Sequence, residues 1–198
     1  MIAIVDTGGA NITSVVNAFA RLGIESALTR DHETIAAAPH VILPGVGAAA
    51  DSMRRLRDGQ LVELICGLTQ PVLGICLGMQ LLFDRSLEGD TECLGILPGA
   101  VEKIPGDIAQ GVTIPHMGWN QLSATQGDNP LLADLPKDPW VYFVHSYYAP
   151  PGEWVVATTT HGITMPAMVQ RDNFMGTQFH PERSGAVGAQ LLRNFTRL

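Results

Sequence analysis

Short apolar runs and amphipathic stretches alternate through the first half of the chain. Each run has the length of a buried strand, and each amphipathic stretch gathers its apolar residues on one side of a helix. Alternation of this kind predicts a parallel sheet covered by helices on both faces. The predicted strands are 2–5, 25–28, 41–43 and 72–74, and the predicted helices are 11–22, 48–56 and 61–68.

The second half of the chain has a different pattern. Helical periodicity fades between Gly95 and Gly176 and returns in a last helix at 185–197, for which Ser184 is the expected N-cap. We expect several strands in between to be antiparallel and to extend the central sheet or pack beside it. These candidate strands are 100–104, 119–122, 141–144, 154–159, 167–170 and 174–177.

The predicted fold is therefore an α/β fold with an open, mostly parallel central sheet and helices on both faces. Additional antiparallel strands belong to its second half. The sequence has no internal repeat, low-complexity tract or linker, so we expect one domain over residues 1–198.

A cysteine stands between two glycines directly after one of the predicted strands. Gly74 lies two residues before Cys76 and Gly78 two residues after it, and a helix is expected at 79–83. This pattern is typical of a nucleophile elbow, a sharp strand-to-helix turn that exposes a reactive side chain. Side chains in place of the glycines would clash in such a turn. On these five residues alone, a buried cysteine in a glycine-rich turn remains an equal alternative.

A histidine and an acid near the C-terminus could complete a catalytic set. A cysteine nucleophile needs a base, and the base needs a partner that fixes its tautomer. His180 and Glu182 supply both groups, and in an extended segment residues two apart face the same way. Pro181 between them favours the extended backbone. We therefore prefer a Cys76-His180-Glu182 triad over a core histidine beside a surface acid.

A glycine-rich turn also follows the strand at 41–43. Backbone N–H groups of Gly45, Val46 and Gly47 could stabilise a developing oxyanion. A phosphate cradle is less well supported because the Lys-Ser/Thr tail of a P-loop is missing, and an ordinary turn remains open. This turn, the turn at Gly8 and the turn at Cys76 all follow parallel strands, where sites gather in such sheets.

Composition narrows the function classes. The 198 residues are 46% hydrophobic and 16% charged, with a net charge of -7. Such an apolar composition suggests an additional face that is buried against a partner. The acidic balance and the lack of a basic patch argue against nucleic-acid binding.

The cysteines, Cys66, Cys76 and Cys93, are odd in number and form no metal-ligand spacing. This argues against a disulfide framework and against a metal site. We expect Cys66 to be a small core residue and assign no role to Cys93 or His116. With neither a signal peptide nor a membrane span in the sequence, we expect a cytoplasmic protein without contact to membranes.

Three segments together resemble the class I, triad-type glutamine amidotransferases. They are Pro44-Gly45-Val46-Gly47, Gly74-Ile75-Cys76-Leu77-Gly78-Met79-Gln80 and Gln178-Phe179-His180-Pro181-Glu182. The resemblance implies that Cys76 attacks the side-chain amide of L-glutamine and His180 carries the proton to the leaving ammonia, while Glu182 orients His180. It implies further that the 45–47 loop and the N–H of Leu77 hold the oxyanion. Gln80 and the stretch His145-Ser146-Tyr147 would lie around the glutamine, and no cofactor is needed.

Further segments are similar to the glutaminase subunits of imidazole glycerol phosphate synthases. They are Met79 after the elbow, the stretch His116-Met117-Gly118-Trp119-Asn120 and the tail Arg183-Ser184-Gly185. The resemblance implies a heterodimer with a (β/α)₈-barrel cyclase subunit that receives ammonia through its interior. It makes Asn11, Met117, Trp119, Asn120 and Arg183 interface candidates. We expect such a glutaminase to be nearly idle alone, with one amide of the 45–47 loop turned away until the partner binds its substrate.

Two other classes stay open. An autonomous cysteine hydrolase acting on esters or lactones would also use an elbow, although in those folds the acid usually precedes the histidine. A scaffold subunit could keep the fold without its activity, but the complete set of Cys76, His180 and Glu182 argues against it.

Overall fold

The computed structural model describes residues 1–8, 12–45, 47–107, 109, 111–125 and 128–198. Its centre is a sheet of eight strands in the order β2-β1-β3-β4-β14-β13-β12-β9. The first five strands in this order run parallel, and the last three are joined to them by antiparallel pairing. They are β2 (Ser26–Thr29), β1 (Ile2–Val5), β3 (Val41–Gly45), β4 (Val72–Cys76), β14 (Phe174–Thr177), β13 (Ile163–Arg171), β12 (Val155–His161) and β9 (Ser123–Ala124).

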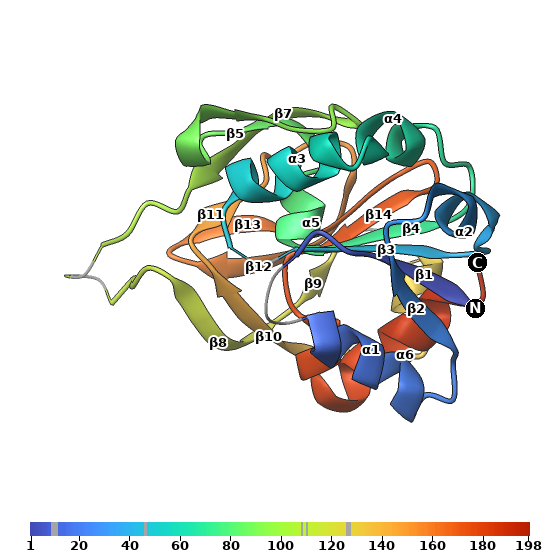
Figure 1. The fold of residues 1–198 in the computed structure, drawn as a ribbon. Helices are drawn as coiled ribbons and strands as arrows, with labels where there is room; N and C mark the ends of the chain where they lie inside the picture. The colour runs from blue at the N-terminus through green and yellow to red at the C-terminus, as the bar shows by residue number, and fades with distance from the viewer. Residues whose placement is uncertain (9–11, 46, 108, 110, 126–127) are drawn as a thin grey trace.

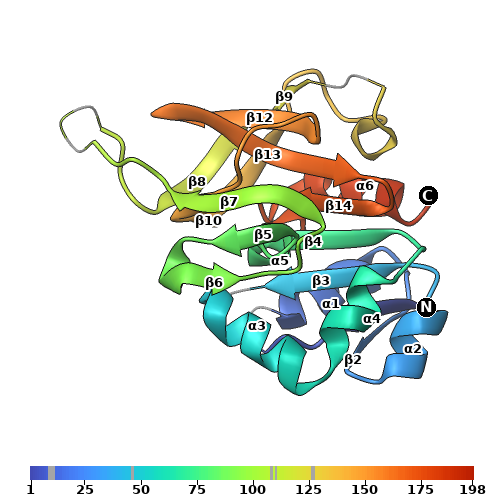
Figure 2. The ribbon, with the colours of Figure 1, turned by 90° about the horizontal axis from the view of Figure 1, so that it is seen from above.

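Helices cover both faces of this sheet (Figures 1 and 2). One face carries α1 (Ile12–Arg21) and α6 (Gly185–Phe195), which share one apolar cluster with the sheet. The other carries α2 (His32–Ala37), α3 (Ala49–Asp58) and α4 (Leu61–Cys66), which share a second cluster. The predicted α/β class is confirmed, with its mostly parallel sheet, its helices on both faces and its antiparallel strands in the second half.

Two small sheets extend the layers on either side of the central sheet. On the side of α3, a four-stranded sheet has the order β11-β7-β5-β6, and on the side of α6, β8 pairs with β10. Their strands are β5 (Phe83–Ser86), β6 (Thr91–Glu92), β7 (Leu97–Lys103), β11 (Tyr147–Tyr148), β8 (His116–Gln121) and β10 (Trp140–His145). Single 3₁₀ turns lie at η1 (Glu88–Asp90), η3 (Pro130–Leu132) and η4 (Pro181–Arg183).

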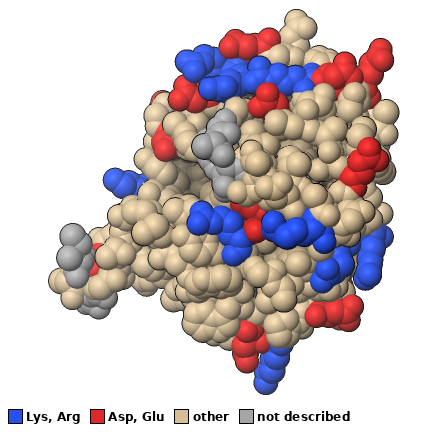
Figure 3. Space-filling model, turned by 60° about the horizontal axis from the view of Figure 1, so that its bottom comes forward, with Lys and Arg blue, Asp and Glu red and all other residues tan. Residues whose placement is uncertain are grey.

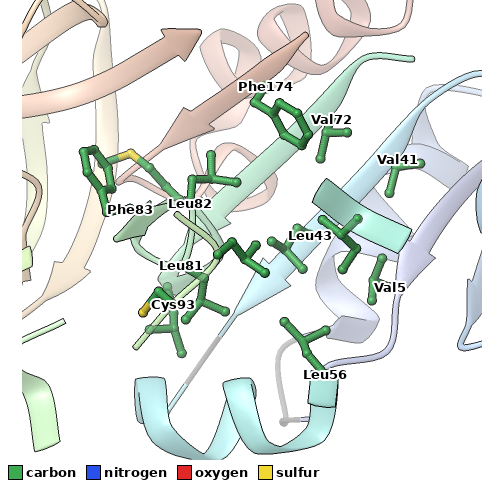
Figure 4. Packing of buried hydrophobic residues seen from close by; sticks show 14 of the residues in the cluster. Val5, Val41, Leu43, Leu56, Val72, Leu81, Leu82, Phe83, Cys93 and Phe174 are labelled. Carbon is green, nitrogen blue, oxygen red and sulfur yellow. The ribbon is translucent and has the colours of Figure 1, made fainter. Parts of the chain in front are cut away.

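The larger apolar cluster shows how the layers are locked together (Figure 4). Leu56 of α3 points at Leu43 and Val5 of the central sheet, and all three are fully buried. Leu81, Leu82 and Phe83 fill the space between this sheet and the small four-stranded one, again without exposure. Burial of such side chains contributes about 1.5–3 kcal/mol each.

The segment after Cys76 departs from the predicted helix at 79–83. The helix there, α5, covers only Leu77–Gln80, and Phe83 begins strand β5. The run Leu81-Leu82-Phe83 is buried on all sides, so its apolar pattern is compatible with a helix end or a strand start. Pairing of Phe83 with Leu97 of β7 makes it a strand.

Ser184 stands at the N-cap of α6 as expected, but its hydroxyl does not cap the helix. It donates to the carbonyl of His180 (2.7 Å) and accepts the N–H of Tyr142 (2.9 Å). Ser184 therefore ties the end of β14 and the η4 turn to β10.

The sequence pattern did not predict α2, β5, β6, β9 and β11, which are all short. In the described part of the chain, no helix has the length and apolar character needed to cross a membrane.

Replacement of Gly78 by alanine should destabilise the fold severely. A Cβ at Gly78 would overlap the carbonyl oxygen of Leu43 in β3, and rigid backbone on both sides leaves no room for adjustment. We expect a loss of at least about 2 kcal/mol in the free energy of unfolding, measured by urea denaturation. Gly23→Ala is the matched control, because a Cβ there meets open space and costs only the strain of a positive φ, about 1 kcal/mol. Equal losses in both variants would contradict the proposed overlap.

Candidate active site

Cys76 ends strand β4 in a strained backbone conformation. Its φ of 54° and ψ of -108° lie outside the regions that L-residues normally adopt. Such strain persists only where the surroundings impose it, and it is common at functional sites. Helix α5 starts at the next residue, Leu77, so Cys76 forms a sharp strand-to-helix turn.

The glycines that flank Cys76 permit this turn by close backbone contact. A Cβ at Gly74 would lie 2.6–2.7 Å from backbone atoms of Gly78 and Met79, and one at Gly45 would lie 2.6 Å from the N atom of Gly78. The clash predicted for side chains at Gly74 and Gly78 is confirmed. The turns after β3 and β4 are therefore in close contact at the carboxyl edge of the sheet, where Gly45 pairs with Cys76.

His180 and Glu182 meet as the sequence predicts. The Nδ1 atom of His180 lies 2.8 Å from Oε1 of Glu182, and both side chains are almost fully buried. Because a carboxylate can only accept, Nδ1 carries the proton and Nε2 is left for the side of Cys76. The backbone N–H of His180 donates to the carbonyl of Tyr142 (2.9 Å), which fixes this segment against β10.

The surroundings of His180 favour its charged form. Burial alone would lower the pKa of the imidazole, but hydrogen bonds to Cys76 and Glu182 and the negative charge of both groups outweigh burial and raise the pKa to about 10. The three side chains therefore act as one electrostatic unit. This arrangement of nucleophile, base and orienting acid is suited to nucleophilic attack on a carbonyl carbon.

Two buried amides complete the surroundings of the sulfur. Nε2 of Gln178 lies 3.7 Å from Sγ of Cys76, and the Oε1 atom of Gln178 accepts a hydrogen bond from Nε2 of Gln80 (2.9 Å). Nε2 of Gln80 also donates to the carbonyl of Tyr147 (2.9 Å). The sulfur is thereby at the acceptor end of a short chain of amide hydrogen bonds.

A cavity of about 450 Å³ opens in front of Cys76. This volume falls within the range of about 300–1,000 Å³ that is usual for small-molecule pockets. The cavity brings together most of the residues predicted for the site. Its lining includes Gly47, Cys76, Leu77, Gln80, Glu88, Pro115, Val144, His145, Ser146, Tyr147, His180 and Arg183.

The candidate oxyanion residues lie on two sides of Cys76. Gly47, with a φ of 92°, and Leu77 line the cavity, whereas Gly45 lines a small space behind the triad together with His180 and Glu182. Leu77 is the first residue of α5, and N–H groups at a helix start have no acceptor within the helix. Val46, the third residue of the predicted loop, lies outside the described residues.

The interface candidates do not all share one surface. Met117 and Trp119 are 65% and 53% exposed on the outer face of β8. Asn120 follows Trp119 directly and therefore points to the opposite face, where its amide contacts Nε2 of His116 (3.1 Å) and the carbonyl of Thr160 (2.9 Å). Asn11 lies outside the described residues.

Arg183 joins the cavity to the outer face of the two-stranded antiparallel sheet formed by β8 and β10, called the β8–β10 hairpin below. Its guanidinium lies over the ring of Tyr142, 4.5 Å from the centroid, and Tyr142 contacts Trp119 edge to face. Trp140 of β10 is 51% exposed and pairs with Gln121, which places it on the same face as Tyr142. Trp140 and Tyr142 enlarge the exposed apolar area and were missing from the predicted interface.

Sequence reasoning also missed Glu88 and Gln178 as site residues. Glu88 lies in the η1 turn, lines the cavity and accepts the N–H of Ala49 at the start of α3 (3.0 Å). No periodic pattern singles out an acid in such a turn. Gln178, by contrast, stands two residues before His180, so strand alternation could have placed both on the face of Cys76.

The remaining cysteines lie away from the cavity. Cys66, the last residue of α4, is exposed, contrary to the expected core position. Cys93 is buried, and burial raises the pKa of its thiol to about 11. Among the described residues, no group of three or more His, Cys, Asp or Glu side chains could hold a metal ion.

Charge on His180 should make stability depend on pH. Its pKa of about 10 in the fold exceeds the 6.5 of a free imidazole, so the stabilisation is fully present below about pH 6.5 and is lost as pH rises toward 10. Denaturant unfolding of the native chain and of His180→Gln, compared across this window, isolates the contribution. We expect the difference in free energy of unfolding to shrink by at least about 1 kcal/mol. A difference that stays constant with pH would contradict a charged His180.

Comparison with known proteins agrees with this geometry. The profile of the family described as "Glutamine amidotransferase class-I" matches residues 3–198. A solved structure entitled glutamine amidotransferase superposes with a TM-score of 0.75 at 20% identity, covering 99% of this chain and 97% of that one. The structure of PurLQS from Thermotoga maritima gives a TM-score of 0.73 at 19% identity, again covering 99% and 97%. These likenesses concern the fold.

Closer relatives are proteins named "Imidazole glycerol phosphate synthase subunit HisH". The one from Xanthomonas axonopodis pv. citri is 51% identical over 197 residues, covering 100% of this chain and 97% of the relative. The one from Shewanella loihica is 46% identical over 205 residues, covering 98% and 89%. The chain belongs to the class-I glutamine amidotransferase family and, within it, to the HisH subunits of imidazole glycerol phosphate synthase.

Proposed function

We propose that this chain hydrolyses L-glutamine to glutamate and ammonia, with residues 1–198 forming one catalytic domain. The observation that carries the proposal is the buried Cys76-His180-Glu182 set at the wall of a cavity, with Cys76 on a strained elbow. HisH relatives with about half of their residues identical support the same activity. The thiol chemistry requires no metal or organic cofactor.

The first half of the reaction is attack by Cys76 on the side-chain amide carbon of glutamine. The new C–S bond pushes the carbonyl electrons onto oxygen, and the N–H groups of Leu77 and Gly47, which line the cavity, stabilise that charge. His180 then gives its proton to the amide nitrogen, the C–N bond breaks, and ammonia leaves. A γ-glutamyl thioester remains on Cys76.

The second half returns the enzyme to its starting state. His180, now neutral, takes a proton from a water molecule that attacks the thioester, and the C–S bond breaks to release glutamate. Glu182 keeps the proton of His180 on Nδ1 throughout, so that Nε2 always faces the reacting atoms. Gln80 and the 145–147 stretch hold the glutamine, consistent with their place in the cavity wall.

Glu88 gives the cavity a means to select an amino acid. Glu88 lies in the cavity wall at the η1 turn and is only partly buried. A free amino acid carries an α-ammonium group, whereas a glutamine residue within a peptide does not. We propose that Glu88 pairs with this ammonium, which would restrict the site to free glutamine.

The fate of ammonia requires a second protein. Ammonia protonates in bulk water and then ceases to be a nucleophile, so a synthase gains from a sealed route. We propose that a (β/α)₈-barrel cyclase subunit docks as a heterodimer and receives the ammonia in its interior. With it, the cyclase forms imidazole glycerol phosphate and aminoimidazole carboxamide ribonucleotide in histidine biosynthesis.

The outer face of the β8–β10 hairpin is the proposed docking surface. Met117, Trp119 and Trp140 are each more than half exposed there, and large exposed apolar areas mark interaction sites. Figure 3 views the molecule from the side of α1, α6 and this hairpin and shows a broad area without Lys, Arg, Asp or Glu. Arg183, beside this face and at the cavity wall, links docking to the site.

A cytoplasmic location would suit the unpaired cysteines.

Loss of the sulfur should abolish glutamate release. In the presence of the cyclase and its nucleotide substrate, we expect Cys76→Ala to lower kcat by at least about 10⁴-fold, whereas Cys93→Ala, at a buried cysteine away from the cavity, keeps near-native activity. A glutamine-analogue electrophile should label the native chain and Cys93→Ala but not Cys76→Ala, as read by intact-protein mass. No glutamate under any condition would overturn the proposed function. Strong activity without the cyclase would keep the chemistry but contradict gating by the 45–47 loop.

Neutralising Glu88 should weaken glutamine binding more than turnover. Glu88→Gln keeps an oxygen that can accept the N–H of Ala49 but removes the charge, so we expect KM for glutamine to rise by about 10–100-fold with kcat within about threefold. Glu92→Gln, an exposed position in β6 outside the cavity, is the control. An unchanged KM in Glu88→Gln would show that the carboxylate does not contact the substrate.

A further inference from the structure

Two buried histidines lie between the β8–β10 hairpin and the site, and the proposed chemistry uses neither of their imidazole rings. His116 and His145 are opposite each other in the register of the hairpin, with Nδ1 of His116 3.0 Å from Nε2 of His145. Their side chains are on the inner face, with His116 stacked on Phe143 (4.6 Å between centroids). Buried polar groups of this kind are costly unless each is satisfied, which makes their partners informative.

The direction of the hydrogen bonds is fixed at Tyr147. Its carbonyl lies 2.8 Å from Nδ1 of His145 and can only accept, so this nitrogen carries a proton. Burial, together with the nearby His116, His161 and His180, lowers the pKa of His145 to about 3 against the effect of the Tyr147 bond. A neutral ring with its proton on Nδ1 has a lone pair on Nε2, which must accept from His116.

The same reasoning continues outward through His116. The Nδ1 atom of His116 must donate to His145. Burial, together with nearby His161, lowers the pKa of His116 to about 4, so the ring is neutral and carries no second proton. Its Nε2 atom therefore accepts a hydrogen bond from the amide of Asn120. The other hydrogen bonds of the Asn120 amide are consistent with this assignment of donors and acceptors. Its Nδ2 also donates to the carbonyl of Thr160 (2.9 Å), and its Oδ1 accepts the N–H of Gln121 (2.8 Å).

On the other side of Tyr147, the chain of bonds reaches the sulfur. The same carbonyl accepts Nε2 of Gln80, whose second proton goes to Oε1 of Gln178, and Nε2 of Gln178 is directed at Sγ of Cys76. One carbonyl oxygen thus receives donors from two directions, from His145 and from Gln80. Any shift of that oxygen would alter how Gln80 is presented to the cavity.

We propose that Asn120, His116 and His145 are positioning residues for the glutaminase reaction: as a hydrogen-bonded relay of fixed polarity they hold the Tyr147 carbonyl and, through it, orient Gln80 and Gln178 around Cys76. The expected kinetic effect rests on the proposed function, whereas the expected tautomers rest on the geometry alone. It assigns Asn120 a role inside the fold rather than in the docking surface.

Direct observation of the tautomers tests the relay without any activity measurement. Nitrogen-15 NMR of histidine rings in the full chain distinguishes Nδ1–H from Nε2–H, and His116→Asn and His145→Asn assign the signals. We expect both rings to be neutral with the proton on Nδ1 and invariant from about pH 5.5 to pH 8. A proton on Nε2 of either ring, or titration of either ring in this window, would overturn the proposal.

Two amide replacements of His116 distinguish the loss of its hydrogen bond to His145 from a general loss of packing. His116 does not line the cavity, so its effect must pass through His145. In His116→Asn the side-chain NH₂ falls near Nδ1 and can still donate to His145, whereas in His116→Gln the amide falls near Nε2 and this donor is lost. In the complex with the cyclase, we expect KM for glutamine to rise about tenfold in His116→Gln and less than about threefold in His116→Asn. Equal kinetics in two folded variants would contradict the relay.

Asn120→Asp adds a readout that a purely structural role would not change. The introduced carboxylate raises the pKa of His116. The other titratable groups near that ring are His145, the stacked His161 (4.3 Å between ring centroids) and, beyond His145, His180. At about pH 6 the charged ring donates from both nitrogens and the relay holds. At about pH 9 the neutral ring turns its one proton to the carboxylate, and two lone pairs face each other between His116 and His145.

We therefore expect the KM of Asn120→Asp, divided by that of the native complex at each pH, to rise from near one at about pH 6 to about tenfold at about pH 9. A ratio that does not vary with pH would contradict the relay. A native complex without glutaminase activity, together with the expected tautomers, would instead refute the proposed function and leave the hydrogen-bond polarity intact.

Discussion

The site depends on how closely the backbone of β3 approaches the turn after Cys76. Gly78 lies against the carbonyl of Leu43, and Gly45 lies against the start of α5, at separations that exclude any side chain. This contact imposes the unusual φ of Cys76 and places Gly47 and Leu77 at the same cavity wall. A conformation that costs free energy is maintained because two buried parallel strands, β3 and β4, leave the turn no alternative.

The other half of the site is supplied by the antiparallel second half of the chain. Strand β14 pairs with β4 and delivers Gln178 and His180 to the sulfur, while β10 lies across the end of β14 and fixes the His180 backbone through Tyr142. The hydroxyl of Ser184 adds a second link between these segments. The docking face, the relay and the base are therefore all attached to one strand, β10, so a displacement of that strand would act on all three together.

The main features of the fold and the site could be predicted because each rests on local chemistry. Apolar periodicity located the long elements, and the glycines around Cys76 indicated a turn that only glycine permits. Glu88 could not be predicted, since its approach to the cavity depends on the pairing of β5 with β7, whose paired residues are 14 or 15 positions apart in the sequence. Phe83 shows the same limit: an apolar run buried on all sides carries no period, and only its distant partner decides between helix and strand.

Asn120 is a different case, because strand alternation alone would have separated it from Trp119. The hydrogen-bond partners of Asn120 also determine whether the buried histidines can conduct a proton. The chain of donors ends at two carbonyl oxygens, those of Thr160 and Tyr147, which accept hydrogen bonds but cannot pass a proton on. The relay is therefore an insulator for proton conduction, although two of its members are imidazoles. Ammonia formed in the cavity can exchange protons with His180 and with water there, but not with the outside solvent through this relay.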